Sequence, residues 1–242
     1  FLIKKFMNLQ RMGIQMIRLV NVNHWYNEGK KNSFKALENI NIAINKGEFV
    51  AVVGQSGCGK TTLLNIASGL MRPSAGEVFY EGKNIYRLDH REIARHRNQN
   101  IGFVFQNYFL EPKFSAFENV CIPLLNGKLK KEKIATRANE ALDLVGLGAK
   151  AENLITELSG GECQRVAIAR AIVNNPKVIF ADEPTGNLDS KNRREIMSLF
   201  QTLSARGKTI ILVTHNESDA QKAKQIIRLH DGKIIAETND AG

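Results

Sequence analysis

A glycine-rich turn between an apolar run and a helical pattern constrains the fold of this chain most strongly. Residues 49–53 read FVAVV, residues 54–62 read GQSGCGKTT, and apolar residues resume at Leu63. This order matches the pattern G-x-x-x-x-G-K-[ST] in the strand, loop and helix setting that the motif requires. Glycines let the backbone turn so tightly that successive N–H groups point inward, beside the positive end of the following helix. The sequence therefore predicts a triphosphate-binding loop.

The side chains of this loop add a cation and hydroxyl groups. We expect Lys60 to contact the outer phosphates and Thr61 to ligate Mg²⁺, a hard ion that prefers oxygen. A glycine-rich turn with an incidental lysine is the alternative, and the complete motif argues against it. The expected nucleotide-binding residues of the loop are Gly54, Gln55, Ser56, Gly57, Cys58, Gly59, Lys60, Thr61 and Thr62.

Two consecutive acids end a second apolar run. Residues 178–184 read VIFADEP, so Asp182 and Glu183 follow a buried strand. Adjacent acids at the end of a buried strand cost free energy unless they are used. We expect Asp182 to hold Mg²⁺ and Glu183 to orient or deprotonate an attacking water. The alternative is a pair of solvated acids at a strand end.

Alternation of strand-like and helix-like patterns predicts an α/β fold with a mainly parallel sheet. Buried parallel strands are expected at 49–53, 178–182 and 209–214, and antiparallel hairpin strands around 40–44 and at 226–235. Helical spacing between about 89 and 155 predicts an inserted helical subdomain. A single domain would then span 16–242, with a core formed by 16–88 and 156–242. Residues 1–15 are expected to be a disordered or ragged extension.

Composition excludes several classes of protein. The apolar stretches fall far short of the roughly 20 residues that a membrane span needs. Three cysteines, an odd number without a CxxC pair, argue against a disulfide framework and against zinc, and favour a reducing cytosol. The net charge of +10 invites a nucleic-acid reading, but the basic residues are spread along the chain.

A second anion site is predicted at LSGGECQR, residues 158–165. Ser159 and Glu162 form a capping box, and Gly160 and Gly161 leave the first amides of the following helix unobstructed. At these residues the chain resembles the ATP-binding subunit of ABC transporters, whose LSGGQ-type signature is matched at Leu158 to Gly161 and at Gln164. The resemblance extends from Met16 to Glu237. It implies a P-loop NTPase core of the ABC ATPase type, with an antiparallel β-subdomain and an inserted helical subdomain.

The resemblance also implies roles for further residues. The signature of one subunit would close over the ATP in the P-loop of the other, so Ser159, Gly160 and Gly161 would act in trans. Gln106 matches the Q-loop glutamine that senses Mg²⁺ and the γ-phosphate, Asp189 lies in the D-loop at the dimer interface, and His215 matches the switch histidine. Tyr26 matches the aromatic that stacks on adenine, although Trp25 beside it stays open. The implied set is Glu183, His215 and Gln106 for catalysis, and Thr61, Gln106 and Asp182 for the metal.

These residues imply an ATPase that dimerises around ATP and drives separate transmembrane permease subunits from the cytoplasmic face of the membrane. ADEPTGNLD and SAFENV resemble the lipoprotein-releasing, macrolide-export and antimicrobial-peptide-resistance group, which implies export. Permease docking is expected at Tyr108, Phe109, Leu110 and Phe114. The alternatives are an ABC ATPase acting on nucleic acid, against which the single cassette argues, and an adaptor that does not hydrolyse ATP, which Glu183 and His215 disfavour.

Two cysteines carry a further hypothesis. In a head-to-tail dimer Cys58 and Cys163 would both border ATP, so alkylation of these thiols should inhibit the ATPase and bound MgATP should protect it.

Overall fold

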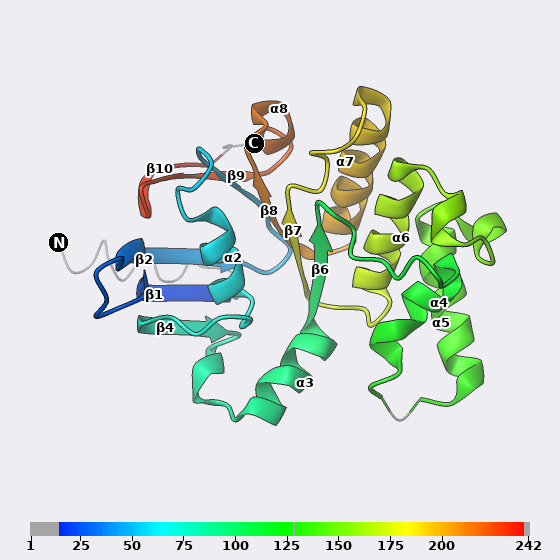
Figure 1. The fold of residues 1–242 in the computed structure, drawn as a ribbon, viewed down its shortest axis with the longest axis horizontal. Helices are drawn as coiled ribbons and strands as arrows, with labels where there is room; N and C mark the ends of the chain where they lie inside the picture. The colour runs from blue at the N-terminus through cyan, green and yellow to red at the C-terminus, as the bar shows by residue number, and fades with distance from the viewer. Residues whose placement is uncertain (1–14, 128, 240–242) are drawn as a thin grey trace.

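A six-stranded sheet forms the centre of the computed structural model, which describes residues 15–127 and 129–239. Its strand order is β10-β9-β3-β8-β7-β6, and every neighbouring pair is parallel except the β9–β10 hairpin (Figure 1). The strands are β3 (Phe49–Val53), β6 (Ile101–Phe105), β7 (Val178–Asp182), β8 (Thr209–Thr214), β9 (Gln225–His230) and β10 (Lys233–Asn239). The predicted parallel strands and the C-terminal hairpin are thus confirmed.

A second, antiparallel sheet covers one side of α2 (Lys60–Ala67), the helix that follows the predicted phosphate loop. Its order is β2-β1-β4-β5, from β1 (Gln15–Tyr26), β2 (Phe34–Asn45), β4 (Ala75–Tyr80) and β5 (Lys83–Asn84). The prediction of an antiparallel strand around 40–44 is confirmed, but β2 pairs with β1 and makes no hairpin with β3. The turn after β2 carries the chain from one sheet to the other. Of the predicted extension, only Gln15 lies among the described residues.

The helical region is shorter than the sequence predicted. After the 3₁₀ turn Ile85–Arg87 and α3 (His90–Asn100), residues 101–105 form β6, which pairs with β7 and belongs to the central sheet. The expectation of helix across 89–155 was wrong here, because a five-residue strand buried between two elements has no long period of its own. The remaining helices are α4 (Ala116–Cys121), α5 (Lys131–Leu144), α6 (Gly160–Ile172), α7 (Ser190–Ala205) and α8 (Glu217–Ala220).

Both faces of the central sheet are buried, because successive side chains of a strand point to opposite faces. Val50, Val52 and Phe180 pack with the antiparallel sheet and with α2 (Lys60–Ala67). Ala51 and Ile179 pack on the other face against the helices from α4 to α7. Figure 1 shows α2 between the two sheets and α6 and α7 beyond β7. A sheet covered on both sides is the arrangement expected for parallel strands.

The register of the parallel strands brings their carboxyl ends to one edge. Val53 lies opposite Thr214, and Asp182 lies opposite Val213 on one side and Phe105 on the other. The segments that follow these strands therefore begin side by side. Ligands of open α/β sheets bind at this edge.

All three cysteine side chains are buried, which corrects the hypothesis that two of them border the nucleotide. Cys58 is 4% exposed, Cys121 8% and Cys163 6%. Burial also raises the pKa of the Cys163 thiol, whose Sγ lies 3.7 Å from the carbonyl oxygens of Ile155 and Leu158. Since the thiolate is the reactive form, neither exposure nor ionisation favours alkylation of Cys163, and burial alone shields Cys58.

We therefore expect the native protein to react slowly with a chromogenic disulfide reagent and to keep its ATPase activity during that reaction. The same protein in guanidinium chloride should titrate three thiols at the rate of free cysteine. Rapid modification of Cys58 in the native state, with loss of activity, would restore the original hypothesis.

Candidate functional site

A cleft of about 640 Å³ lies at the carboxyl edge of the central sheet. Pockets of this size hold small-molecule ligands. Most of the predicted site residues line it, together with two residues that sequence reasoning did not single out, Phe34 and Ala36. The predicted residues in its wall are Tyr26, Ser56, Gly57, Gly59, Lys60, Thr61, Thr62, Gln106, Asp182, Glu183 and His215.

The P-loop is closed around the Lys60 side chain. Its Nζ donates to the carbonyl oxygens of Gly54 and Gln55, both at 2.8 Å, and the residue is only 8% exposed. The loop has no room for larger residues at two positions. A Cβ on Gly54 would lie 2.2 Å from the Leu229 carbonyl oxygen, and Gly59 has φ +104°, which L side chains rarely adopt. These glycines are required by close backbone approach, as a phosphate cradle demands.

Three of the predicted loop residues lie outside the cleft wall. Gly54 and Gln55 border an adjoining hollow of about 370 Å³ on the β9–β10 side. The Cys58 side chain points into the core, while its carbonyl oxygen accepts from the Gly232 N–H at 3.0 Å. Only the backbone of Cys58 is therefore available to a nucleotide.

The candidate metal ligands Thr61 and Asp182 face each other across the cleft floor. Thr61 Oγ1 lies 3.3 Å from Asp182 Oδ2. Burial raises the pKa of the Asp182 carboxyl, against the hydrogen bond from Thr61, which lowers it. A partly buried carboxylate beside a hydroxyl is the oxygen pair that Mg²⁺ prefers. The ion would offset the desolvation of the acid, so these residues fit the metal.

Glu183 and His215 form a pair at the ends of neighbouring strands. Glu183 Oε1 lies 2.9 Å from His215 Nδ1, and Thr214 Oγ1 donates to Glu183 Oε2 at 3.3 Å. His215 is exposed, whereas the Glu183 side chain is only 17% exposed. The backbone of Glu183 has φ +47°, an uncommon value for a residue with a side chain. Strained backbone of this kind clusters at functional sites.

Gln106 follows β6 and reaches toward the loop after β7. Its Nε2 donates to Asn187 Oδ1 at 3.2 Å, and Asn187 Nδ2 donates to the Gln106 carbonyl oxygen at 3.4 Å. The amide oxygen of Gln106 takes no part in these two bonds. Asn187 belongs with Leu188 and Asp189 to the predicted D-loop, so the predicted Q-loop and D-loop are in direct contact.

Of the two candidate adenine platforms, Tyr26 lines the cleft and Trp25 does not. Tyr26 stacks on Phe34, with ring centroids 5.2 Å apart, and its hydroxyl lies 3.2 Å from Thr62 Oγ1. Phe34 is 56% exposed and widens the aromatic wall. A single phenylalanine at the start of a strand is usually a core residue, so the sequence carried no signal for it.

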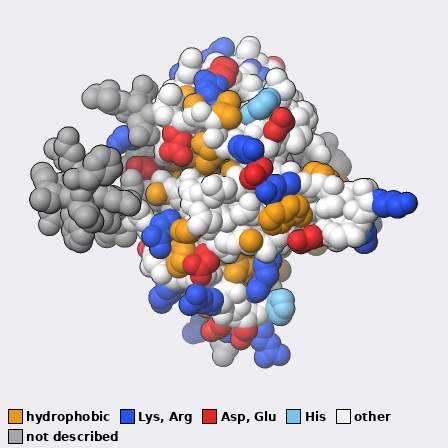
Figure 2. Space-filling model, turned by 90° about the vertical axis from the view of Figure 1, so that its left-hand side faces the viewer, with side chains coloured by type: hydrophobic (Ala, Val, Ile, Leu, Met, Phe, Trp, Pro, Cys, Tyr) orange, Lys and Arg blue, Asp and Glu red, His pale blue; other side chains and the backbone are white. Residues whose placement is uncertain are grey.

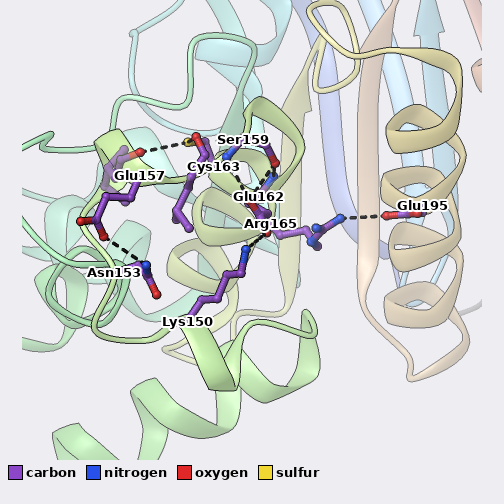
Figure 3. A network of polar contacts seen from close by, with 10 residues as sticks. Lys150, Asn153, Glu157, Ser159, Glu162, Cys163, Arg165 and Glu195 are labelled. Carbon is purple, nitrogen blue, oxygen red and sulfur yellow. Dashed lines mark hydrogen bonds and ion pairs between the residues drawn. The ribbon is translucent and has the colours of Figure 1, made fainter.

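The signature segment lies outside the cleft, at the start of α6 (Figure 3). Ser159 and Glu162 form the predicted capping box, with Ser159 N donating to Glu162 Oε2 at 2.9 Å. Lys150 Nζ binds the same carboxylate at 2.6 Å; this contact, with those from Ser159, lowers the pKa of Glu162 to about 2. The carboxylate therefore stays ionised, and Ser159 and Gly160 remain exposed.

The signature and the D-loop are neighbours. A Cβ on Gly161 would lie 2.1 Å from Asn192 Oδ1, so α6 begins against the first turn of α7. Asp189 caps that turn by accepting from the N–H groups of Lys191 and Asn192, which lowers the pKa of its carboxyl. Ser159, Gly160, Gly161 and Asp189 thus lie away from the cleft wall of their own chain.

The chain is similar to a protein family, to curated proteins and to solved structures. The family model described as ABC transporter matches residues 37–186. An uncharacterized ABC transporter ATP-binding protein of Methanocaldococcus jannaschii is 46% identical over 220 residues, 91% of this chain and 98% of that protein. The macrolide export ATP-binding/permease protein MacB of Syntrophobacter fumaroxidans is 44% identical over 232 residues, which cover 95% of this chain and 32% of that protein.

Among solved structures, the ATP-binding cassette MJ0796, described as dimeric in a post-hydrolysis state with ADP and Pi, is similar throughout. The TM-score is 0.86 at 42% identity, over 94% of this chain and 100% of that one. The predicted α/β fold with a mainly parallel sheet and an antiparallel β-subdomain is therefore confirmed. The chain belongs to the ABC transporter family, as an ATP-binding subunit with the fold and activity class of the ABC ATPases.

Proposed function

We propose that this subunit hydrolyses MgATP between two copies of itself and thereby powers export through separate permease subunits. The proposal rests on the separation of the predicted site residues into two groups on the surface of one chain. One edge of the sheet holds the P-loop, Asp182, Glu183 and His215, while Ser159 and Gly160 of the signature lie exposed elsewhere on the chain.

Within the cleft, each group has a chemical task. Lys60 and the amides of residues 54–61 would bind phosphate oxygens, and Thr61 and Asp182 would hold Mg²⁺, which supplies charge stabilisation there. Glu183 would accept a proton from water, and His215, bonded to it, would orient that carboxylate. Gln106 would offer its amide oxygen near the metal, and Tyr26 would stack on the adenine.

The exposed signature fits a partner that completes the site. A helix start with uncapped glycine amides binds anions. Ser159 and Gly160 are exposed and separated from their own P-loop cleft, so a second copy in head-to-tail contact would use them. The related cassette with ADP and Pi is described as dimeric, which supports the same arrangement here.

Another hollow, of about 520 Å³, lies between α3, β6 and α6 and suits a permease segment. Its wall includes Leu70, Phe103, Ile122 and Arg170. Of the four predicted docking residues, Phe109 is 64% exposed and Phe114 41%, while Tyr108 and Leu110 are half-buried. Phe109 packs edge-on against Phe105 at the rim of this hollow. Exposed apolar surface of this kind marks interaction sites.

Other features bear on the location of this chain, on the direction of transport and on the nucleic-acid alternative. No helix among the described residues is long and apolar enough to cross a membrane. We assign the transport path to permease subunits because the chain belongs to the ABC transporter family, and we place the chain beside them at the cytoplasmic surface. Similarity to a macrolide export protein supports export over import. Figure 2 shows basic and acidic side chains interspersed on the described part of one face, which does not favour the nucleic-acid alternative.

Replacing Glu183 with Gln should lower kcat for ATP by about a hundredfold or more, because proton transfer is lost while nucleotide contacts remain. Phosphate release and equilibrium ATP binding measure the two effects. Glu77→Gln, at an exposed ion pair with Arg87, is the matched control and should behave like the parent. A Glu183→Gln variant as fast as the parent would remove Glu183 from this role.

Mixing two inactive variants tests the shared site. Lys60→Ala and Ser159→Arg should each abolish hydrolysis alone, yet an equimolar mixture should recover about a quarter of the parental rate. Half of the dimers would be mixed, and each would hold one intact site of two. A mixture as inactive as its components, with dimers formed, would place the complete site within one chain.

Phe109→Asp should weaken capture of the permease at least about tenfold, because a charge would enter an apolar contact. The ATPase rate of the isolated subunit should stay within about twofold of the parent, since Phe109 lies outside the cleft. Ile235→Asp, equally exposed at 64% but on β10, is the control. Undiminished capture by Phe109→Asp would exclude this surface.

A further inference from the structure

Asp219 is the most deeply buried acidic residue in the part of the chain that the structure describes. It lies in α8 and is 3% exposed. Its Oδ2 accepts a hydrogen bond of 2.6 Å from the Thr185 hydroxyl, which is itself 2% exposed. Burying a carboxylate is costly unless it is hydrogen-bonded, and charge-assisted bonds of this length are strong. Filling space in the core therefore does not by itself explain why an acidic residue is buried at position 219.

The bond joins the two segments that carry the proposed catalytic pair. Thr185 lies two residues after Glu183, in the loop that follows β7. Asp219 lies four residues after His215, in the short helix that follows β8. In addition to the pairing of β7 with β8, the hydrogen bond between Thr185 and Asp219 thus links these two segments directly through side chains. Neither residue of the contact lines the cleft wall.

Further hydrogen bonds close this tie into a ring. The Asp219 N–H donates to Asn216 Oδ1 at 3.1 Å, and the Asn216 N–H donates to Thr214 Oγ1 at 3.0 Å. Thr214 Oγ1 in turn donates to Glu183 Oε2 at 3.3 Å. From Glu183 the backbone returns to Thr185 and so to Asp219. Thr214 Oγ1 accepts one of these bonds and donates another, so the two reinforce each other.

The ring includes a residue whose backbone conformation needs support. Glu183 has φ +47°, and uncommon backbone of this kind persists only where the surroundings over-determine it. The strand pairing holds Glu183 on one side, through its N–H bond to the Val213 carbonyl oxygen at 2.9 Å. The bond between Thr185 and Asp219 holds the chain on the other side.

We infer that Asp219 is a positioning residue for ATP hydrolysis, which acts through Thr185 to hold Glu183 in register with His215. The inference rests on the proposed role of Glu183. It predicts an effect on turnover and little effect on nucleotide binding, because neither Asp219 nor Thr185 lines the nucleotide cleft.

The test uses the full chain, with four single variants and one double variant at the bond. Asp219→Ala and Thr185→Val each remove it, and both should lower kcat by about tenfold to a hundredfold, the loss expected from a displaced catalytic group. KM for MgATP, and ATP affinity measured in a Glu183→Gln background, should change less than about twofold. Asp219→Asn keeps an accepting oxygen and Thr185→Ser keeps the hydroxyl, so both should retain most of the turnover. The double variant Asp219→Ala/Thr185→Val should be no slower than either single variant, because the two share one interaction.

Thr209→Val is the control for loss of a buried threonine hydroxyl. Thr209 is fully buried at the start of β8, remote from the site, and accepts from the Gly47 N–H at 2.9 Å. This variant should lower the thermal midpoint while leaving kcat unchanged. The positioning role is overturned if Thr185→Val lowers only the thermal midpoint, if KM rises at constant kcat, or if Asp219→Asn loses as much turnover as Asp219→Ala. A parent chain without ATPase activity would instead overturn the proposed function.

Discussion

The parallel register of β3, β8, β7 and β6 determines where the candidate catalytic groups lie. Val53, Thr214, Asp182 and Phe105 end their strands at one level of the sheet. Residues 54–61, Glu183, His215 and Gln106 each follow one of those ends, and Asp182 is itself the last residue of β7. A shift of one residue in any pair would reverse the faces of that strand and expose its core side chains. Burial of both sheet faces therefore also secures the geometry of the site.

The helix α2 fixes the position of the predicted phosphate loop relative to the central sheet. It packs between the two sheets, with Leu63, Leu64 and Ile66 buried, so its first turn cannot move independently of β3. The antiparallel sheet that covers α2 also carries Tyr26 and Phe34 to the cleft. The candidate phosphate and adenine contacts thus come from different sheets, and the hydrophobic core that these sheets share sets the distance between them.

Surface exposure explains why one chain is proposed to be incomplete. The capping box at Ser159 and the cap at Asp189 satisfy the local backbone of two adjoining helices. The starts of α6 and α7 meet at Gly161, where no side chain would fit. The signature and the D-loop therefore lie side by side. A partner that contacts one of them would contact the other. Gln106, bonded to Asn187, ties this surface back to the cleft.

The sequence by itself determined the phosphate loop, the acid pair after β7, the signature cap and the parallel strands, because short-range spacing controls each of them. It did not find β6 as a strand, since five buried residues carry no distinguishing period. It also missed Phe34, and it placed Cys58 and Cys163 beside the nucleotide although both side chains pack into the interior. Only the tertiary structure decided which residues meet across the chain: Thr61 with Asp182, Gln106 with Asn187, and Thr185 with Asp219. Those contacts follow from strand order and register, which depend on the burial of both sheet faces at once and not on any local pattern.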